Sequence, residues 1–221
     1  MENNAGSNRF ITVKGIGSIT AQPDLTTITM KLETKTMDYE QTMQRATSEI
    51  ELVRQALISI GHERQALKTI DFNVNTDYDS QRDAEGNFIR RFTGYKCSHA
   101  LKLEMDFNMK RLGETLVAIS ASGASPEFQI AFSVKDKAAV SAELLESAIA
   151  NAKDKAAILA KAANVQLGDI QRIDYSWGEL KLFTDTKYND MMLSEASASY
   201  MDIEPDDIDA TDTVTVVWSI G

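Results

Sequence analysis

The sequence has few of the residues that build cross-linked or metal-bound scaffolds. It contains one cysteine, Cys97, two histidines and three prolines in 221 residues. A lone cysteine excludes an intrachain disulfide and a cysteine-based metal cluster, and two histidines exclude a histidine-rich metal site. We therefore expect no bound metal, and the fold must rest on its hydrophobic core.

Positive charge is also scarce. The chain has 23 Lys and Arg residues against 33 Asp and Glu residues, which gives a formal net charge of −10. Binding to phosphate backbones or anionic lipid needs a basic surface instead. No run approaches the roughly 18 apolar residues of a membrane-spanning helix. The sequence thus predicts a soluble, acidic protein with no nucleic-acid binding and no membrane insertion.

The first eight residues are polar and lack the basic start and apolar stretch of an export signal. We expect residues 1–8 to form a disordered tail, and we expect a cytoplasmic location for the chain as written. A periplasmic or envelope location is the alternative if an export signal has been removed.

Motifs for phosphate, nucleotide or acyl chemistry are absent. The sequence has no GxxxxGK[ST] and no GxSxG pattern. Gly15-Ile-Gly17 lacks the third glycine of a dinucleotide fingerprint, and Pro23-Asp24 and a strand follow it rather than a helix. Such glycines in a strand indicate a bulge or a close backbone approach. The sequence predicts no catalytic residues and no cofactor, which favours a protein without enzymatic activity.

Much of the chain alternates between apolar and polar residues with a period of two. In segment 25–36, Thr26, Ile28, Met30 and Leu32 share one face, and the other face is polar. This pattern is typical of half-buried strands in an antiparallel sheet. Strands are predicted at 10–20, 25–36, 68–75, 88–107, 128–134, 170–177 and 213–220.

Three segments have the three-and-four spacing of amphipathic helices. They cover 39–60, 109–122 and 138–163. Asp38 and Asn108 are the expected N-caps of the first two helices, and Gly61 and Gly123 stand where helix-ending glycines are expected. The predicted buried stripe of the alanine-rich third helix consists of Leu145, Ile149, Ala152, Ala156, Leu159 and Ala163.

Strands and helices are interspersed, and several strand pairs can form hairpins. This order favours the α+β class, with a mainly antiparallel sheet and three helices packed on one face. Residues 178–210 have weak periodicity and are expected to form a long loop, an arm or a partly helical insertion.

Several short motifs occur in a characteristic order. They are Val13-Lys-Gly-Ile-Gly17, Pro23-Asp24, Leu57-Ile-Ser-Ile-Gly61, Lys68-Thr-Ile-Asp-Phe72, Thr93-Gly-Tyr95, Gly123-Ala124, Ile203-Glu-Pro205 and Val214-Thr-Val-Val-Trp218. With this set, residues 9–221 resemble the SIMPL-domain family, a domain of unknown function. The resemblance implies a single domain with two coupled βαβ-containing subdomains, 9–92 plus 211–221 and 93–177, and with 178–210 as an insertion.

The resemblance implies little chemistry. Members of the family include bacterial envelope proteins, some of them immunogenic and one associated with oxidative-stress tolerance. Some members form ring-like or channel-like oligomers, and a eukaryotic relative binds a signalling kinase. The family has no established catalytic residues, so none is carried over to this chain. A homo-oligomer, a further protein partner and a stress-related role are the expectations that follow.

An apolar group within the polar insertion is the predicted interaction site. It consists of Met191, Met192, Leu193, Tyr200 and Met201. Apolar residues on a projection often mark an interface, and methionine adapts to irregular partners. The equal alternative is a loop that folds back on its own sheet.

Two acidic segments are best explained as solvent-exposed turns. The first contains Asp77, Asp79, Asp83 and Glu85. A calcium-binding EF-hand loop needs Gly at its sixth and Glu at its twelfth position, where this chain has Arg82 and Phe88. The second segment contains Glu204, Asp206, Asp207, Asp209 and Asp212, and its alternative role is to bind a cation or a basic partner.

Cys97 and His99 lie two residues apart on a predicted strand and point to the same face. A Cys–His pair can generate a thiolate nucleophile, but these side chains start about 7 Å apart and no third, orienting residue is identifiable. The prediction is a buried cysteine beside a hydrogen-bonded histidine.

The sequence is compatible with two functions. The leading one is a non-enzymatic, self-associating scaffold or binding protein of the SIMPL type. The alternative is a small-molecule-binding protein or weak enzyme that uses a cleft between subdomains, where ligands commonly bind.

Overall fold

The computed structural model describes residues 9–82, 87–175, 181–184, 188–189 and 204–221. The chain divides into two compact units. Unit 1 consists of Met1–Pro23, Val134–Thr184 and Asp206–Gly221, and unit 2 of Asp24–Ser133 and Asp185–Pro205. These units differ from the subdomains that we expected, whose boundary at residue 92 would separate strands that pair in one sheet.

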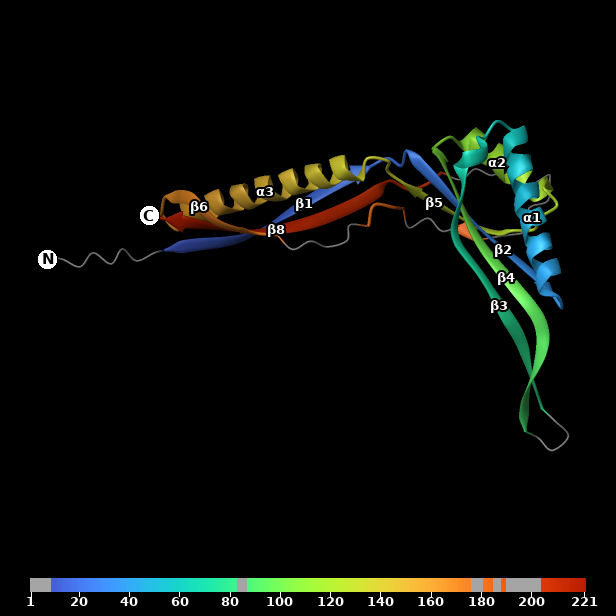
Figure 1. Ribbon diagram of the computed structural model, residues 1–221. Coiled ribbons are helices and arrows are strands. Elements are labelled where there is room, and N and C mark those ends of the chain that lie inside the picture. The colour runs from blue at the N-terminus through green and yellow to red at the C-terminus, as the bar shows by residue number, and fades with distance from the viewer. Residues whose placement is uncertain (1–8, 83–86, 176–180, 185–187, 190–203) are drawn as a thin grey trace. The chain divides into compact units, whose positions relative to one another are not determined.

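Unit 2 is built on a five-stranded sheet. Its strands are β2 (Leu25–Thr36), β3 (Leu67–Arg82), β4 (Phe88–Asp106), β5 (Glu127–Ser133) and β7 (Tyr188–Asn189). They lie in the order β3-β4-β2-β5-β7, and each neighbouring pair is antiparallel. Helices α1 (Tyr39–Ser59) and α2 (Met109–Ala121) pack on this sheet, and a short 3-10 helix, η1 (Arg64–Ala66), precedes β3 (Figure 1).

The alternation along β2 decides which face of this sheet is buried. Ile28, Met30 and Leu32 are buried, whereas Lys31 and Glu33 between them are exposed. The helices complete the core of unit 2 with Ile50, Val53 and Leu57 from α1 and with Leu112, Leu116 and Ile119 from α2. The buried face that the sequence predicted for β2 is thus confirmed.

Local hydrogen bonds fix the helix ends in unit 2. The Asp38 side chain accepts a hydrogen bond from the backbone N–H of Gln41 at 2.9 Å, and Asn108 accepts one from that of Arg111 at 2.9 Å. Each bond satisfies an N–H group that the first helical turn leaves free. Gly61 follows α1 with φ of +86°, a conformation that favours glycine. The two predicted N-caps and the stop at Gly61 are confirmed.

Unit 1 is a three-stranded antiparallel sheet with one long helix. Strands β1 (Phe10–Ala21), β8 (Ile208–Ile220) and β6 (Leu167–Asp174) lie in the order β1-β8-β6. Helix α3 (Lys137–Ala162) runs along β1 and β8 (Figure 1). Strand β8 begins earlier than predicted, because buried Ile208 and Ala210 alternate with acidic and polar residues that made this segment look like a turn.

Helix α3 approaches β1 closely because both surfaces lack large side chains. A Cβ added at Gly15 would lie 2.0 Å from the carbonyl oxygen of Ala148, and one at Gly17 would lie 2.1 Å from that of Leu144. β1 pairs with β8 without a register shift. Of the two alternatives for these glycines, the close backbone approach is therefore correct.

The buried stripe of α3 differs from the predicted one. It consists of Leu144, Ala148, Ala152, Ala156 and Ala160. Ala152 and Ala156 were predicted correctly, but Leu159 is half-exposed. On the neighbouring side, the Asn151 side chain accepts a hydrogen bond from the backbone N–H of Ile16 at 3.0 Å, so α3 also covers part of the free edge of β1.

The predicted fold class, α+β with mainly antiparallel strands, is confirmed. The helices are divided between two sheets, however, rather than packed on one face of a single sheet: α1 and α2 belong to unit 2 and α3 belongs to unit 1. No helix in the part of the chain that the structure describes is long and apolar enough to cross a membrane.

Candidate functional site

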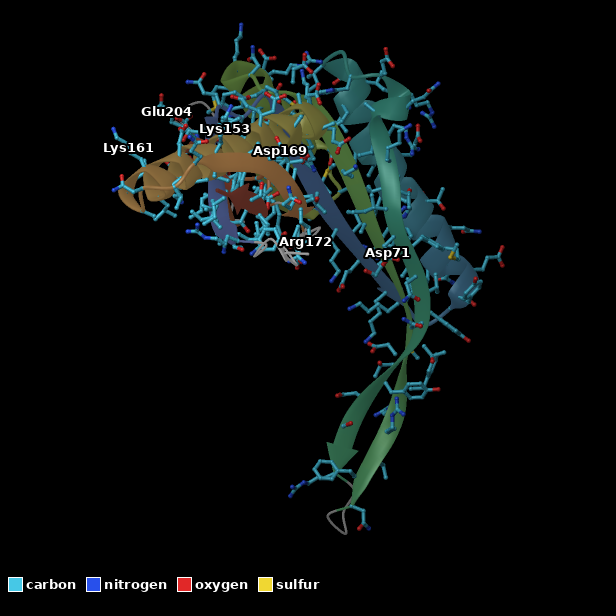
Figure 2. All side chains as sticks on the ribbon, turned by 90° about the vertical axis from the view of Figure 1, so that its left-hand side faces the viewer. Asp71, Lys153, Lys161, Asp169, Arg172 and Glu204 are labelled. Carbon is cyan, nitrogen blue, oxygen red and sulfur yellow. The ribbon has the colours of Figure 1, made fainter. Side chains whose placement is uncertain are left out.

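The β3–β4 hairpin continues beyond the rest of its sheet. β2 ends at Thr36, which pairs with Tyr95, whereas β3 and β4 continue to pair as far as Arg82 and Phe88. Among the described residues, no third strand accompanies this distal part, residues 76–82 and 88–94, which we call the distal ribbon. Figures 1 and 2 show it as a two-stranded projection. An isolated two-stranded ribbon is at best marginally stable in water.

A bulge and a glycine set the direction of the distal ribbon. The register shifts between Asp77 and Tyr78, which leaves Thr93 without an opposite residue. Gly94 has φ of +128°, and a Cβ there would lie 2.3 Å from the carbonyl oxygen of Thr36. Only glycine fits this conformation and this contact. Beyond the bulge, Tyr78 lies opposite Phe92 and the two rings share one face of the ribbon.

The rings on this face form a continuous series of contacts. The ring centroids of Tyr78 and Phe92 are 5.7 Å apart, those of Phe92 and Tyr95 are 5.4 Å apart, and those of Tyr95 and Tyr39 at the start of α1 are 5.5 Å apart. All three pairs are edge-to-face, a favourable arrangement worth about 0.5–1.5 kcal/mol per pair. These contacts support the ribbon where no further strand does.

Two arginines belong to the same face. The guanidinium of Arg90 lies 4.7 Å from the ring centroid of Tyr78, and that of Arg82 lies 4.8 Å from the ring centroid of Phe88. Both are cation–π distances. Neither arginine forms an ion pair with a carboxylate of the described residues. We call Tyr78, Arg82, Phe88, Arg90, Phe92 and Tyr95 the aromatic–arginine face.

This face is unusually apolar for an exposed surface. Phe88 is 72% exposed, and Tyr78 and Phe92 are also exposed. Single exposed apolar residues are normal, but a contiguous group on a projection commonly marks a binding surface. Aromatic residues and arginine are also the residues that are most enriched at the centres of protein interfaces.

The opposite face of the ribbon is polar apart from Ile89. Lys35 forms an ion pair with Asp77 at 2.6 Å, and its hydrogen bond holds the pKa of that carboxyl below the usual range. Asp79 lies opposite Arg91 and Gln81 lies opposite Ile89. The contrast between the two faces gives the ribbon one surface suited to water and one suited to a partner.

Cys97 and His99 do not form a reactive pair. Both are buried, and burial, reinforced by Glu49, raises the pKa of the Cys97 thiol, which therefore stays protonated. His99 Nε2 lies 2.8 Å from Thr69 Oγ1, and its ring packs edge-to-face on Phe72. Burial lowers the pKa of His99, so the ring is neutral. The predicted buried cysteine beside a hydrogen-bonded histidine is found.

The other predicted sites have mixed outcomes. The predicted interaction residues Met191, Met192, Leu193, Tyr200 and Met201 lie outside the described residues, as do Asp83 and Glu85. Asp209 and Asp212 lie on strand β8, where they accept hydrogen bonds from Thr20 and Tyr175, rather than on an exposed turn. In the described ranges, no three His, Cys, Asp or Glu side chains come together as a metal site.

Reasoning from the sequence missed the aromatic–arginine face. Its members are spread over two strands, and the sequence indicated only a hairpin-like loop followed by a strand. The alternation of Phe88, Arg90 and Phe92 was a usable signal for one half of the face. The pairing with Tyr78 was not visible because it depends on the bulge at Thr93.

No curated protein matches the chain. The family model SIMPL, described as a protein of unknown function (DUF541), matches residues 11–218. That range covers nearly all of both units and every strand of the two sheets, so this chain belongs to the SIMPL family.

Proposed function

We propose that the chain is a non-enzymatic scaffold or binding protein that self-associates and uses the aromatic–arginine face as a contact surface. One observation carries the proposal: a two-stranded ribbon presents a contiguous group of exposed rings that no described residue covers. Burying such rings against a partner is favourable at roughly 25 cal/mol per Å² of apolar surface.

The buried state of Cys97 and His99 gives no support to nucleophilic catalysis. The alternative from the sequence, a small-molecule-binding protein or weak enzyme with a cleft between subdomains, stays a prediction. The oligomeric state of the full chain separates the two functions, because only the scaffold requires self-association.

The test is the solution mass of the full chain, measured by light scattering at several concentrations. We expect a stable multiple of 24.4 kDa. In the double variant Tyr78→Ala/Phe88→Ala we expect the mass to fall toward that of one chain. Ile89→Ala removes an exposed apolar side chain from the opposite face of the same ribbon and should leave the mass unchanged. A monomer at every concentration would overturn the proposal and favour the small-molecule alternative.

A further inference from the structure

The chain distributes its charges unevenly along the sequence. Lys187 is the last basic residue, and every charged side chain after it is acidic. The most concentrated part is Glu204–Asp209, which we call the acidic stretch. Glu204, Asp206, Asp207 and Asp209 are all exposed, and Glu204–Asp207 lies outside helices and strands. The carboxylates of this segment are therefore accessible to a partner.

Among the described residues, the carboxylates of the acidic stretch have no cationic partner. Thr20 donates a hydrogen bond to Asp209 at 2.6 Å. Glu204, Asp206 and Asp207 form no ion pair with any described residue. The acidic stretch thus has the opposite charge of Arg82 and Arg90, which also lack an ion-pair partner among the described residues. The acidic stretch can therefore supply carboxylates to the two arginines, and the arginines can supply guanidinium groups to the acidic stretch.

The two surfaces are complementary in side-chain chemistry as well as in charge. Pro205 stands between acidic residues in the stretch, and proline is a residue that aromatic side chains bind well. Arginine already positioned over a ring presents its N–H donors to carboxylates in a planar fork. None of the six residues that define the aromatic–arginine face is acidic.

We infer that the acidic stretch of a second copy of this chain binds the aromatic–arginine face, with Arg82 and Arg90 pairing with Asp206 and Asp207 and Pro205 packing on the rings. This inference rests on the proposed self-association and names its second surface. Two different surfaces then meet at each contact. Such a contact leaves one free surface of each kind on a pair, so it generates either a closed ring or an open filament.

Charge reversal tests the pairing. We expect Arg82→Glu/Arg90→Glu and Asp206→Lys/Asp207→Lys each to reduce the full chain to a monomer in sedimentation velocity. Mixing these two monomeric variants should restore assembly, because the natural acidic stretch of one variant meets the natural face of the other, and the two reversed surfaces are also opposite in charge. High salt should weaken both this mixed assembly and the wild-type assembly.

Two matched controls accompany the test. Arg91→Glu makes the same charge change on the opposite face of the ribbon, and Glu143→Lys/Glu146→Lys reverses two exposed carboxylates on α3. Both should assemble like the wild type. If a reversal variant loses its far-UV circular dichroism, neutral variants take the place of the two charge-reversal variants. These are Arg82→Gln/Arg90→Gln and Asp206→Asn/Asp207→Asn, and each should still weaken assembly.

The outcomes separate this inference from the proposed function. If Tyr78→Ala/Phe88→Ala abolishes assembly but Asp206→Lys/Asp207→Lys assembles normally, the face is an interface and the acidic stretch is not its partner. The same conclusion follows if the two reversal variants are monomeric but do not combine when mixed. A wild-type chain that never self-associates overturns both.

Discussion

His99 is a buried residue whose protonation the fold opposes. The residue is only 8% exposed, and its Nδ1 atom has no hydrogen-bond partner among the described residues. Burial lowers its pKa, the nearby positive charge of Arg54 lowers it further, and Asp71 partly compensates. His62, which contacts Thr115 Oγ1 at 2.9 Å, has a pKa that is lowered by burial and by Arg111.

The stability of the protein should therefore depend on pH through these two residues. Both folded-state pKa values lie below the unfolded value of about 6.5, so the unfolded state binds protons first as the pH falls. The stabilising contribution is complete above that value and is lost as the pH drops toward the folded-state pKa values. We expect the urea concentration at the unfolding midpoint of the wild type to decrease as the pH is lowered from about 7.5 to about 5.

The double variant His62→Gln/His99→Gln should show a smaller decrease over the same pH range. Each single variant should be intermediate, since each retains one of the two lowered pKa values. A double variant that loses as much stability as the wild type would show that other groups are responsible.

Hydrogen bonds lower the pKa of the Glu51 carboxyl on α1 to about 2. The main cause is hydrogen bonding from Arg64, whose two Nη atoms lie 2.8 and 2.9 Å from its two oxygens, followed by hydrogen bonds from Gln55 and Arg54. This arrangement ties η1 to α1.

Arg64→Ala should raise the pKa of Glu51 toward its ordinary value of 4.5 without reaching it, because Gln55 and Arg54 remain. Carboxyl chemical shifts followed by NMR through an acid titration give this pKa directly. Lys110→Ala, which removes the partner of Glu114 on α2, is the matched control and should leave the Glu51 titration unchanged. An unchanged Glu51 pKa in Arg64→Ala would contradict the assignment of the main cause.

At the scale of elements, the contact between α3 and β1 is the most demanding packing in unit 1. A Cβ at Gly15 would lie 2.0 Å from Ala148 O and 2.7 Å from Ala152 Cβ, and both of these atoms are fixed within the helix. Gly15→Ala therefore requires the helix to move off the strand. Overpacking of this kind costs about 1–3 kcal/mol and occasionally more.

We expect Gly15→Ala to lower the free energy of unfolding of unit 1 by about 3 kcal/mol, the upper end of that range, and so to lower its unfolding midpoint. Tryptophan fluorescence in a denaturant titration measures it, because Trp218 is buried in this unit. Ser18→Ala changes an exposed position of the same strand and should stay within about 0.5 kcal/mol of the wild type. Equal midpoints for Gly15→Ala and the wild type would mean that α3 is not held against β1.

The elements themselves could be predicted from the sequence because their patterns are local. The alternation along β2 and the caps at Asp38 and Asn108 need only neighbouring residues, and all three predictions are confirmed. The buried stripe of α3 was partly wrong because alanines occur on several sides of that helix. Its buried side is selected by Gly15 and Gly17, which lie more than a hundred residues earlier in the chain.

The candidate site was harder to predict for a similar reason. Alternation predicts which residues of a single strand share a face, but Tyr78 and Phe92 meet only because Thr93 is bulged. A bulge of one residue reverses the faces of everything beyond it. The sequence contains no simple mark of that bulge apart from Gly94, so the aromatic–arginine face emerges only from the structure.

At the scale of the whole molecule, the chain builds separate cores that share no residues. The core of unit 2 takes its side chains mainly from β2, β3, β4, β5, α1 and α2, and the larger core of unit 1 takes its side chains from β1, β8 and α3. Trp218 is buried in the core of unit 1. Its fluorescence therefore reports on unit 1, whereas far-UV circular dichroism reports on both units.

We expect the two signals to give different denaturant transitions, because separate cores need not unfold together. Gly15→Ala should shift the fluorescence transition, together with the phase of the circular dichroism that coincides with it. The remaining phase of the circular dichroism, which reports on unit 2, should stay in place. Leu116→Ala, which opens a cavity at a fully buried position of unit 2, should cost about 2–5 kcal/mol and shift that remaining phase alone. If both probes coincide in the wild type and move together in both variants, the units unfold as one cooperative body. Either result also bears on the assembly experiments. Only if the units are independently stable can a change in the distal ribbon of unit 2 destabilise that unit and still leave unit 1 folded.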